Sequence, residues 1–157
     1  MIELQLVGVR VELPTNQPIV LLKEREGERY LPVWIGHVEA TAIAQGMQGI
    51  ETARPLTHDL MRDLLTSLGV DVERILITEL RKGTFYAEIH LVREGSRTQV
   101  SSRPSDAIAL ATRLNVPIWC NEEVLEEASI VVRDDEEQEV EKFREFLEQV
   151  TPEDFAQ

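Results

Sequence analysis

The residues best suited to chemistry lie in two short stretches that resemble each other, RPLTHDL at 54–60 and RPSDAI at 103–108. Each begins with Arg-Pro, continues with a hydroxyl residue and then supplies an aspartate, and the first adds an imidazole. Proline favours the first turn of a helix, a hydroxyl can cap the free amides there, and the helix dipole stabilises an aspartate. The pattern therefore predicts two helix starts, and we expect any chemical site to lie where they meet.

Charge is distributed unevenly along the chain. The 157 residues fit one domain, and 43% hydrophobic with 29% charged residues is an ordinary globular balance. Residues 122–157 hold fourteen acidic and three basic residues, a net charge of −11 out of −13, so residues 1–121 are nearly neutral. Proteins that bind nucleic acid electrostatically are usually basic. Strong non-specific binding to nucleic acid is therefore not expected, whereas the acidic tail could recruit a basic partner.

Two further features concern location and redox chemistry. No apolar run approaches the roughly 20 residues of a membrane span, and the N-terminus shows no secretory signal. We expect a cytoplasmic protein with no membrane partner. The single cysteine, Cys120, lies in an apolar run and cannot form an internal disulfide, so it is expected to be a buried structural thiol.

Hydrophobic spacing predicts an α+β fold. The expected strands cover residues 2–13, 19–22, 30–35, 72–80, 84–92, 98–101 and 117–120, and the expected helices cover 37–48, 57–68, 104–114, 121–128 and 138–149. A meander and a hairpin should form mixed or antiparallel sheets packed with three to four helices. Residues 1–130 are predicted to be one compact domain, and residues 131–157 an acidic linker with a short amphipathic helix, docked on its own domain or on another subunit.

Four segments in the expected order are similar to the bifunctional nuclease domain family. They are LPVWIGHVEATAI at 31–43, RPLTHDL at 54–60, GTFYAEI at 83–89 and SRPSDAIALATR at 102–113. The resemblance covers about residues 1–130. It implies an α+β domain that self-associates as a homo-oligomer and a nuclease that acts on RNA, DNA or both, since plant members act on both.

The two helix starts hold side chains that suit phosphodiester hydrolysis. Asp59 and Asp106 could jointly bind a divalent cation, with hard oxygen ligands suiting Mg²⁺ or Mn²⁺. An unperturbed imidazole titrates near neutral pH, so His58 is the candidate general base or acid. Arg54 and Arg103 would bind phosphate oxygens through paired N–H groups. These five residues form the predicted site.

A structural role is the alternative for the same residues. An arginine beside a helix start that carries an aspartate is commonly half of an ion pair, and such an aspartate is commonly a cap. Arg54, Asp59, Arg103 and Asp106 would then hold two helices together, with His58 as a buried hydrogen-bond bridge. The corresponding function is a non-catalytic, oligomeric interaction module.

Other residues carry weaker signals. Glu39, near a third helix start, could add a third carboxylate to the metal site. His37 and His90 have no partner at metal-ligand spacing. Phe85 and Tyr86 lie on opposite faces of a predicted strand, so one could stack a base while the inward-facing ring packs in the core.

Overall fold

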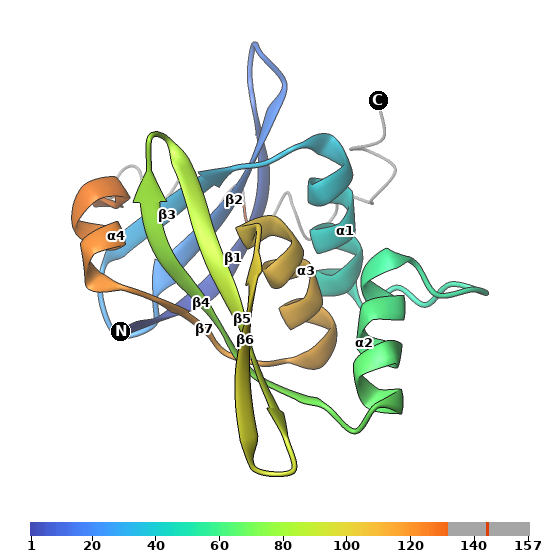
Figure 1. Cartoon of the computed structure of the whole chain (residues 1–157). Helices are drawn as coiled ribbons and strands as arrows, with labels where there is room; N and C mark the ends of the chain where they lie inside the picture. Colours follow the sequence, from blue (N-terminus) through green and yellow to red (C-terminus); the bar gives the residue numbers. More distant parts are fainter. Residues whose placement is uncertain (132–143, 145–157) are drawn as a thin grey trace.

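The computed structural model describes residues 1–131 and residue 144. Its described part contains one eight-stranded sheet and four helices (Figure 1). The strands are β1 (Ile2–Glu12), β2 (Gln17–Glu24), β3 (Arg29–Trp34), β4 (Asp71–Arg81), β5 (Thr84–Arg93), β6 (Ser96–Ser102), β7 (Ile118–Cys120) and β8 (Ile130–Val131). The helices are α1 (His37–Gln48), α2 (Thr57–Ser67), α3 (Pro104–Leu114) and α4 (Glu122–Ala128). The predicted α+β class and single compact domain are confirmed.

Two antiparallel meanders form the sheet, and β7 joins them. The strand order is β6-β5-β4-β7-β1-β2-β3-β8, with β7 parallel to β4 and antiparallel to β1. Lys82 and Gly83 between β4 and β5, and Glu94 and Gly95 between β5 and β6, all have positive φ. Two consecutive residues with positive φ match the right-handed twist of the flanking strands, which explains both tight hairpins.

Helix α3 is the central helix of the domain. Its residues 107–111 are all buried, and it packs against β4 and β5 on one side and against α1 and α2 on the others. Gly46 of α1 faces Thr112 of α3 so closely that a Cβ atom at position 46 would overlap the Thr112 hydroxyl. A glycine at this position therefore lets α1 and α3 lie side by side, and their N-termini emerge at the same end.

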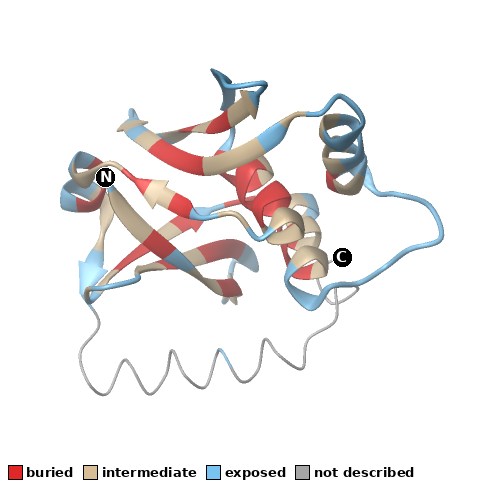
Figure 2. Cartoon of the chain, turned by 90° about the horizontal axis from the view of Figure 1, so that it is seen from below, coloured by how far each residue is buried: buried red, intermediate tan, exposed pale blue. Residues whose placement is uncertain are grey.

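Helix α2 packs mainly on α3 rather than on the sheet. It lies on the outer side of α3 (Figure 2), and only Met61 and Leu65 pack against the core. Leu60, Leu64 and Leu68 are between 48% and 59% exposed. A stripe of leucines specifies an apolar helix face, but which neighbour covers that face depends on the tertiary arrangement.

Two sequence expectations lie outside what the structure tests. The predicted amphipathic helix at 138–149 falls outside the described residues, and the division of the chain at residue 130 stays a prediction. In the described part of the chain, no helix has both the length and the apolar character needed to cross a bilayer.

Candidate functional site

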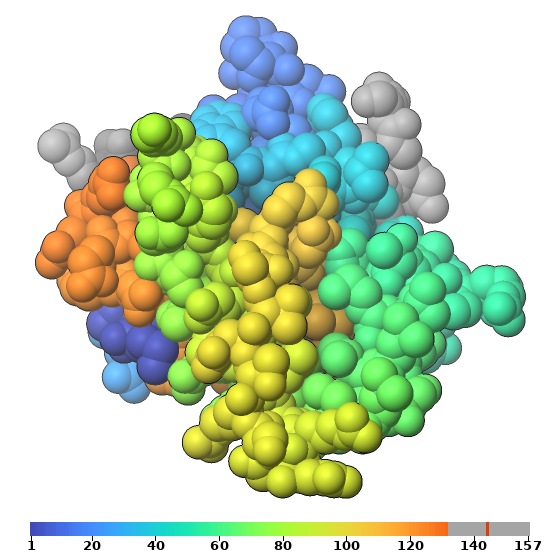
Figure 3. Space-filling model, in the orientation of Figure 1, coloured from blue at the N-terminus to red at the C-terminus, as the bar shows by residue number. Residues whose placement is uncertain are grey.

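The N-termini of α1 and α3 open onto one surface cleft of about 340 Å³. The cleft also borders the end of β3 and the β4–β5 turn, and Figure 3 shows where this lime hairpin, the cyan start of α1 and the gold start of α3 meet. Its lining residues are Gln17, Val33, Trp34, Ile35, Gly36, Glu39, Gly83, Thr84, Phe85, Arg103, Pro104 and Ser105. Its volume is within the range of sites for small molecules, about 300–1,000 Å³.

Both helix starts favour an anion in this cleft. The N-cap residues are Gly36 for α1 and Arg103 for α3, and neither makes a side-chain capping hydrogen bond. Amides of the first turn are consequently not capped by side chains, and each helix N-terminus carries a partial positive charge of about half a unit. Such N-termini are established sites for phosphate and carboxylate groups.

Arg103 connects the two helix starts and still exposes part of its guanidinium. Its Nε donates to Asp106 Oδ2 at 2.8 Å, and its Nη1 donates to Glu39 Oε1 at 2.9 Å. These hydrogen bonds raise the pKa of Arg103, so the side chain is always charged. The side chain is 63% exposed, and Nη2 has no partner among the described residues. This N–H group is therefore available to an anion in the cleft.

Asp106 joins Arg103 to the imidazole of His58. Asp106 Oδ1 lies 3.0 Å from Nε2 of His58, which is buried at the second position of α2. Burial of Asp106 opposes its ionisation, but hydrogen bonds from Arg103 and His58 outweigh burial and lower its pKa. A continuous polar chain thus runs from Glu39 on α1 through α3 to His58 on α2.

Asp59 belongs to a separate link between α2 and α3. Its Oδ1 accepts from Arg113 Nε at 2.7 Å, and its Oδ2 accepts from the Leu56 amide at 3.0 Å. The Arg113 guanidinium also donates to the carbonyls of Ala42 at 3.0 Å and Ala109 at 2.8 Å. Because Arg113 lies near the end of α3, Asp59 is directed away from the α3 start.

The sequence model of the bifunctional nuclease domain matches residues 20–133, which include the whole cleft apart from Gln17. The chain belongs to the bifunctional nuclease domain family. This match confirms the family resemblance predicted from the four segments.

Relatives of this bifunctional nuclease domain protein occur in bacteria and plants. The uncharacterized protein Rv1829 of Mycobacterium tuberculosis is 49% identical over 98% of this chain and 97% of its own length. Bifunctional nuclease 2 of Arabidopsis thaliana is 29% identical over 69% of this chain and 35% of its own length. Bifunctional nuclease 1 of the same plant is 26% identical over 66% and 33%. The similar region therefore amounts to about a third of each plant protein.

The two predicted helix starts, those of α2 and α3, are in contact, but the cleft lies between the start of α3 and that of a third helix, α1. The starts of α2 and α3 touch through His58 and Asp106, whereas α1 shares the cleft with α3. Arg54 is exposed in the loop before α2, and its side chain has no ion pair in the described part of the chain. The predicted capping by Thr57 and Ser105 is wrong because these residues lie within the first helical turns, after the N-caps.

The structure does not gather the predicted metal ligands. Both carboxylate oxygens of Asp59 and of Asp106 already accept hydrogen bonds, and Glu39 is bound to Arg103. Within residues 1–131 and residue 144, no three His, Cys, Asp or Glu side chains form a metal-binding group. These donors do not fit a divalent cation in this arrangement, and a role for Mg²⁺ or Mn²⁺ stays a prediction.

Two cleft residues were not identified as site residues from the sequence. Ser105 is 6% exposed and lines the cleft, and its hydroxyl has no hydrogen-bond partner among the described residues. Trp34 is exposed at the end of β3. Strand alternation was the available signal, because Val33 and Ile35 are buried and Trp34 must then face the other way.

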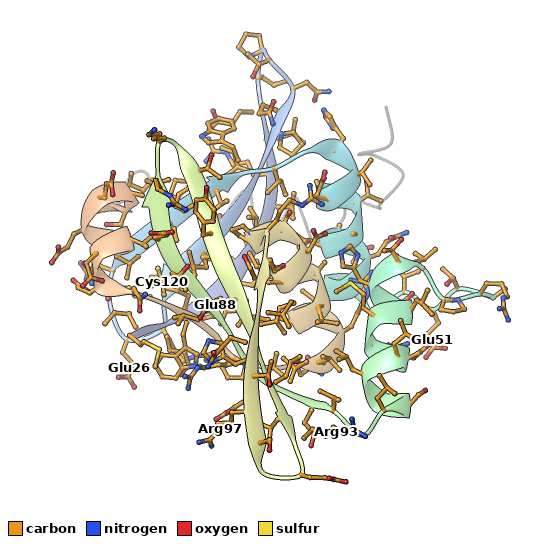
Figure 4. All side chains as sticks on the ribbon, in the orientation of Figure 1. Glu26, Glu51, Glu88, Arg93, Arg97 and Cys120 are labelled. Carbon is orange, nitrogen blue, oxygen red and sulfur yellow. The ribbon has the colours of Figure 1, made fainter. Side chains whose placement is uncertain are left out.

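Cys120, His90 and the two aromatic residues of β5 have structural surroundings. Cys120 is buried as predicted, and burial raises the pKa of its thiol to about 12, so it is a poor nucleophile. His90 is paired with Glu88 at 3.1 Å, and both residues belong to β5. Figure 4 labels Glu88. Phe85 packs against the core, and the Tyr86 ring lies under Arg81 with 4.6 Å from its guanidinium carbon to the ring centre.

Acid is expected to weaken the link between α2 and α3. Burial opposes ionisation of Asp59, but the Leu56 amide and the Arg113 guanidinium outweigh it and lower its pKa. A carboxyl with a lower pKa in the folded than in the unfolded chain stabilises the fold above the unfolded value, about 3.9. That stabilisation is lost as pH falls through the folded value. The free energy of unfolding should therefore decrease from about pH 4 downward.

Urea unfolding from pH 7 to pH 2.5 measures this dependence. Asp59→Asn should reduce stability at pH 7 and flatten the decrease in acid. Asp63→Asn changes an exposed aspartate of the same helix and should keep the wild-type pH dependence. An unchanged acid decrease in Asp59→Asn would refute the assignment.

Proposed function

We propose that the protein is a nuclease that hydrolyses phosphodiester bonds in RNA, DNA or both, with its site in the α1–α3 cleft. Family membership supports the reaction class. The observation that carries the location is the convergence of two helix starts without side-chain caps on the exposed guanidinium of Arg103 and on the hydroxyl of Ser105, which has no hydrogen-bond partner among the described residues. Each of these groups donates hydrogen bonds, and a phosphodiester offers only acceptors.

Arg103 Nη2 and the amides of the helix starts bind the non-bridging phosphate oxygens in this proposal. Negative charge grows on those oxygens when the nucleophile attacks phosphorus, so fixed donors stabilise the transition state more than the bound substrate. Asp106 binds one ring nitrogen of His58 and so orients this imidazole, which lies outside the cleft lining; its part in proton transfer stays a prediction. Glu39 and Asp106 hold the Arg103 guanidinium in place.

Location, assembly, substrate class and cofactor are also part of the proposal. We propose a cytoplasmic homo-oligomer with RNA or DNA as substrate. Mg²⁺ or Mn²⁺ stays a proposed cofactor, which the cleavage assay tests through its metal and chelator conditions. The local charge of the cleft opposes phosphate less than the net charge of the chain does. The charged lining residues, Arg103 and Glu39, balance each other, whereas the acidic excess belongs to residues 122–157.

A non-catalytic interaction module is the second candidate function. The Asp59–Arg113 pair favours it, because both side chains are mostly buried and their hydrogen bonds join α1, α2 and α3. Those residues serve the fold. In the cleft, Arg103 Nη2 has no partner among the described residues, and this group distinguishes the two functions.

Adding one negative charge at the mouth of the cleft tests the proposed function. Thr84 is exposed on the β4–β5 hairpin and lines the cleft, so Thr84→Glu should repel the phosphate and slow cleavage by about 10-fold. Thr98→Glu adds the same charge to another exposed strand residue outside the cleft and should cleave like the wild type. Labelled single-stranded RNA and DNA would be assayed with Mg²⁺, with Mn²⁺ and with chelator.

Three results are decisive in this assay. Cleavage that co-elutes with the wild type and is selectively slowed by Thr84→Glu supports the nuclease at this cleft. Equal slowing by Thr84→Glu and Thr98→Glu would show that the site lies outside this cleft. Identical traces from wild type and variants in every metal condition would indicate a contaminant and favour the interaction module.

A further inference from the structure

A large aromatic side chain lies exposed at the edge of the α1–α3 cleft. Trp34 is the last residue of β3, is 53% exposed, and lines the cleft together with Arg103. Its neighbours Val33 and Ile35 are buried in the core. Tryptophan has a large apolar ring that is usually covered, so a ring left half in water beside a cleft marks a surface that gains from a partner.

The other aromatic ring of the cleft is less available. Phe85 also lines the cleft, but it packs against the core and is partly buried. Tyr86, the next residue, lies outside the cleft lining and is engaged by Arg81. Of the two aromatic residues that line the cleft, Trp34 is therefore the one with a free face.

The cleft thus combines an aromatic face with groups that bind an anion. Arg103 provides its Nη2 group, which has no partner in the described part of the chain, and the starts of α1 and α3 face the same space of about 340 Å³ without side-chain caps. A nucleotide matches both features, because one sugar joins an aromatic base, which can stack on the tryptophan, to a phosphate, which the anion-binding groups can hold. An acidic peptide would match the anion site but would leave the tryptophan face unused.

We propose that Trp34 stacks an unpaired nucleobase whose neighbouring phosphate is bound at Arg103, so that the protein selects single-stranded nucleic acid. This inference rests on the proposed nuclease function and specifies its substrate. Aromatic side chains stack bases of any sequence, because every base has a π face. In a duplex both faces of a base are covered by neighbouring bases, so a base must first be unstacked before it can reach Trp34.

Trp34 itself can report the binding. Trp119 is the other tryptophan of the chain, so Trp119→Phe leaves Trp34 as the single indole fluorophore. A 12-nucleotide single-stranded DNA and a duplex of the same sequence would be titrated in chelator. Saturable quenching by the single strand is expected, with the duplex binding at least 10-fold more weakly.

Substitution at position 34 separates stacking from simple apolar contact. Trp34→Leu keeps apolar bulk and should weaken binding of a dye-labelled single strand by about 10- to 100-fold in fluorescence anisotropy. Trp34→Phe retains a π face and should lose less than about 5-fold. Tyr86→Leu removes an aromatic ring outside the cleft and should bind like the wild type. Thermal unfolding of each variant verifies that it is folded.

The outcomes distinguish this inference from the proposed function. Equal affinity for single strand and duplex, or wild-type binding by a folded Trp34→Leu, would overturn the stacking role. Cleavage that depends on the charge at position 84 but not on Trp34 would do the same and leave the nuclease standing. Binding that requires Trp34 without cleavage in any metal condition would support stacking and overturn the nuclease.

Discussion

Replacing Arg113 by methionine is expected to lower the free energy of unfolding by about 3–5 kcal/mol. The Arg113 side chain is 5% exposed, and its guanidinium bonds Asp59 and the carbonyls of Ala42 and Ala109. Methionine keeps much of the apolar stem but leaves the Asp59 carboxylate mostly buried without its cationic partner. The large effect arises from this unpaired charge, because removing one member of a buried pair is far more destabilising than the pair is stabilising.

Urea denaturation at pH 7 measures this effect. Arg62→Met is the matched control, because Arg62 pairs with Asp63 on the exposed side of α2 and should contribute less than about 1 kcal/mol. Adding Asp59→Asn to Arg113→Met should restore part of the stability, since the unpaired charge is then gone. A loss below about 1 kcal/mol in Arg113→Met would show that the pair does not hold α1, α2 and α3 together.

Replacing Arg103 by methionine is expected to slow phosphodiester cleavage by about 100-fold or more, with a loss of stability of at most about 1 kcal/mol. Arg103 is 63% exposed, so its ion pairs with Glu39 and Asp106 are accessible to solvent and contribute little to folding. Its Nη2 group has no partner among the described residues and binds the phosphate in the proposed function. Arg103→Lys keeps the charge but loses the forked donors and should retain only part of the activity.

Initial cleavage rates and urea denaturation of the same preparations test this prediction. Arg81→Met is the control, because Arg81 is 59% exposed on the hairpin and lies outside the cleft. It should cleave at the wild-type rate. Wild-type cleavage by Arg103→Met would remove the guanidinium from the mechanism, and equal losses of activity and folding would assign Arg103 to the fold alone.

The two arginines fit the two roles, structural and chemical, that the sequence allows for the residues at the helix starts. Arg113 is buried and uses its donors within the protein, whereas Arg103 is exposed and its Nη2 group has no partner among the described residues. The structural interpretation thus fits Asp59, which Arg113 binds. The chemical interpretation fits the start of α3, where Arg103 and Ser105 border the cleft. Asp106 fits both interpretations, because it holds the Arg103 guanidinium at the cleft and also links α3 to α2 through His58.

The family relationship makes a cleavage measurement on this chain informative about the shared domain. The uncharacterized protein Rv1829 is similar over nearly its whole length, whereas the plant bifunctional nucleases are similar over about a third of theirs. Cleavage measured for this chain would therefore test whether the shared domain suffices for the reaction, without the remaining two thirds of the plant proteins.

Local sequence patterns were sufficient to predict most elements of the described fold. Hydrophobic spacing marked the strands, the short break between 72–80 and 84–92 marked a hairpin, and the Arg-Pro pattern at 103–108 marked the start of the central helix. These features depend on neighbours within a few residues, so the chain specifies them locally. The two aspartates also lie at the third position of their helices, as the helix-start pattern indicated.

Contacts between elements could not be read from the same patterns. The repeated Arg-Pro stretches predicted one site where their helix starts meet, but Asp59 is paired with Arg113, 54 residues later, and Arg54 does not line the cleft. The exposed leucines of α2 show the same limit, because a helix pattern specifies a face and not its neighbour.

The sequence by itself determined the fold class, the helix starts, the buried cysteine and the family. Only the tertiary structure decided which helix starts share a cleft, because Gly46 allows α1 to lie against α3 and bring Glu39 to Arg103. It also decided that Trp34 borders that cleft. The physical reason is the range of the interactions: helix and strand formation depends on nearby residues, whereas the cleft depends on the packing of segments far apart in the chain.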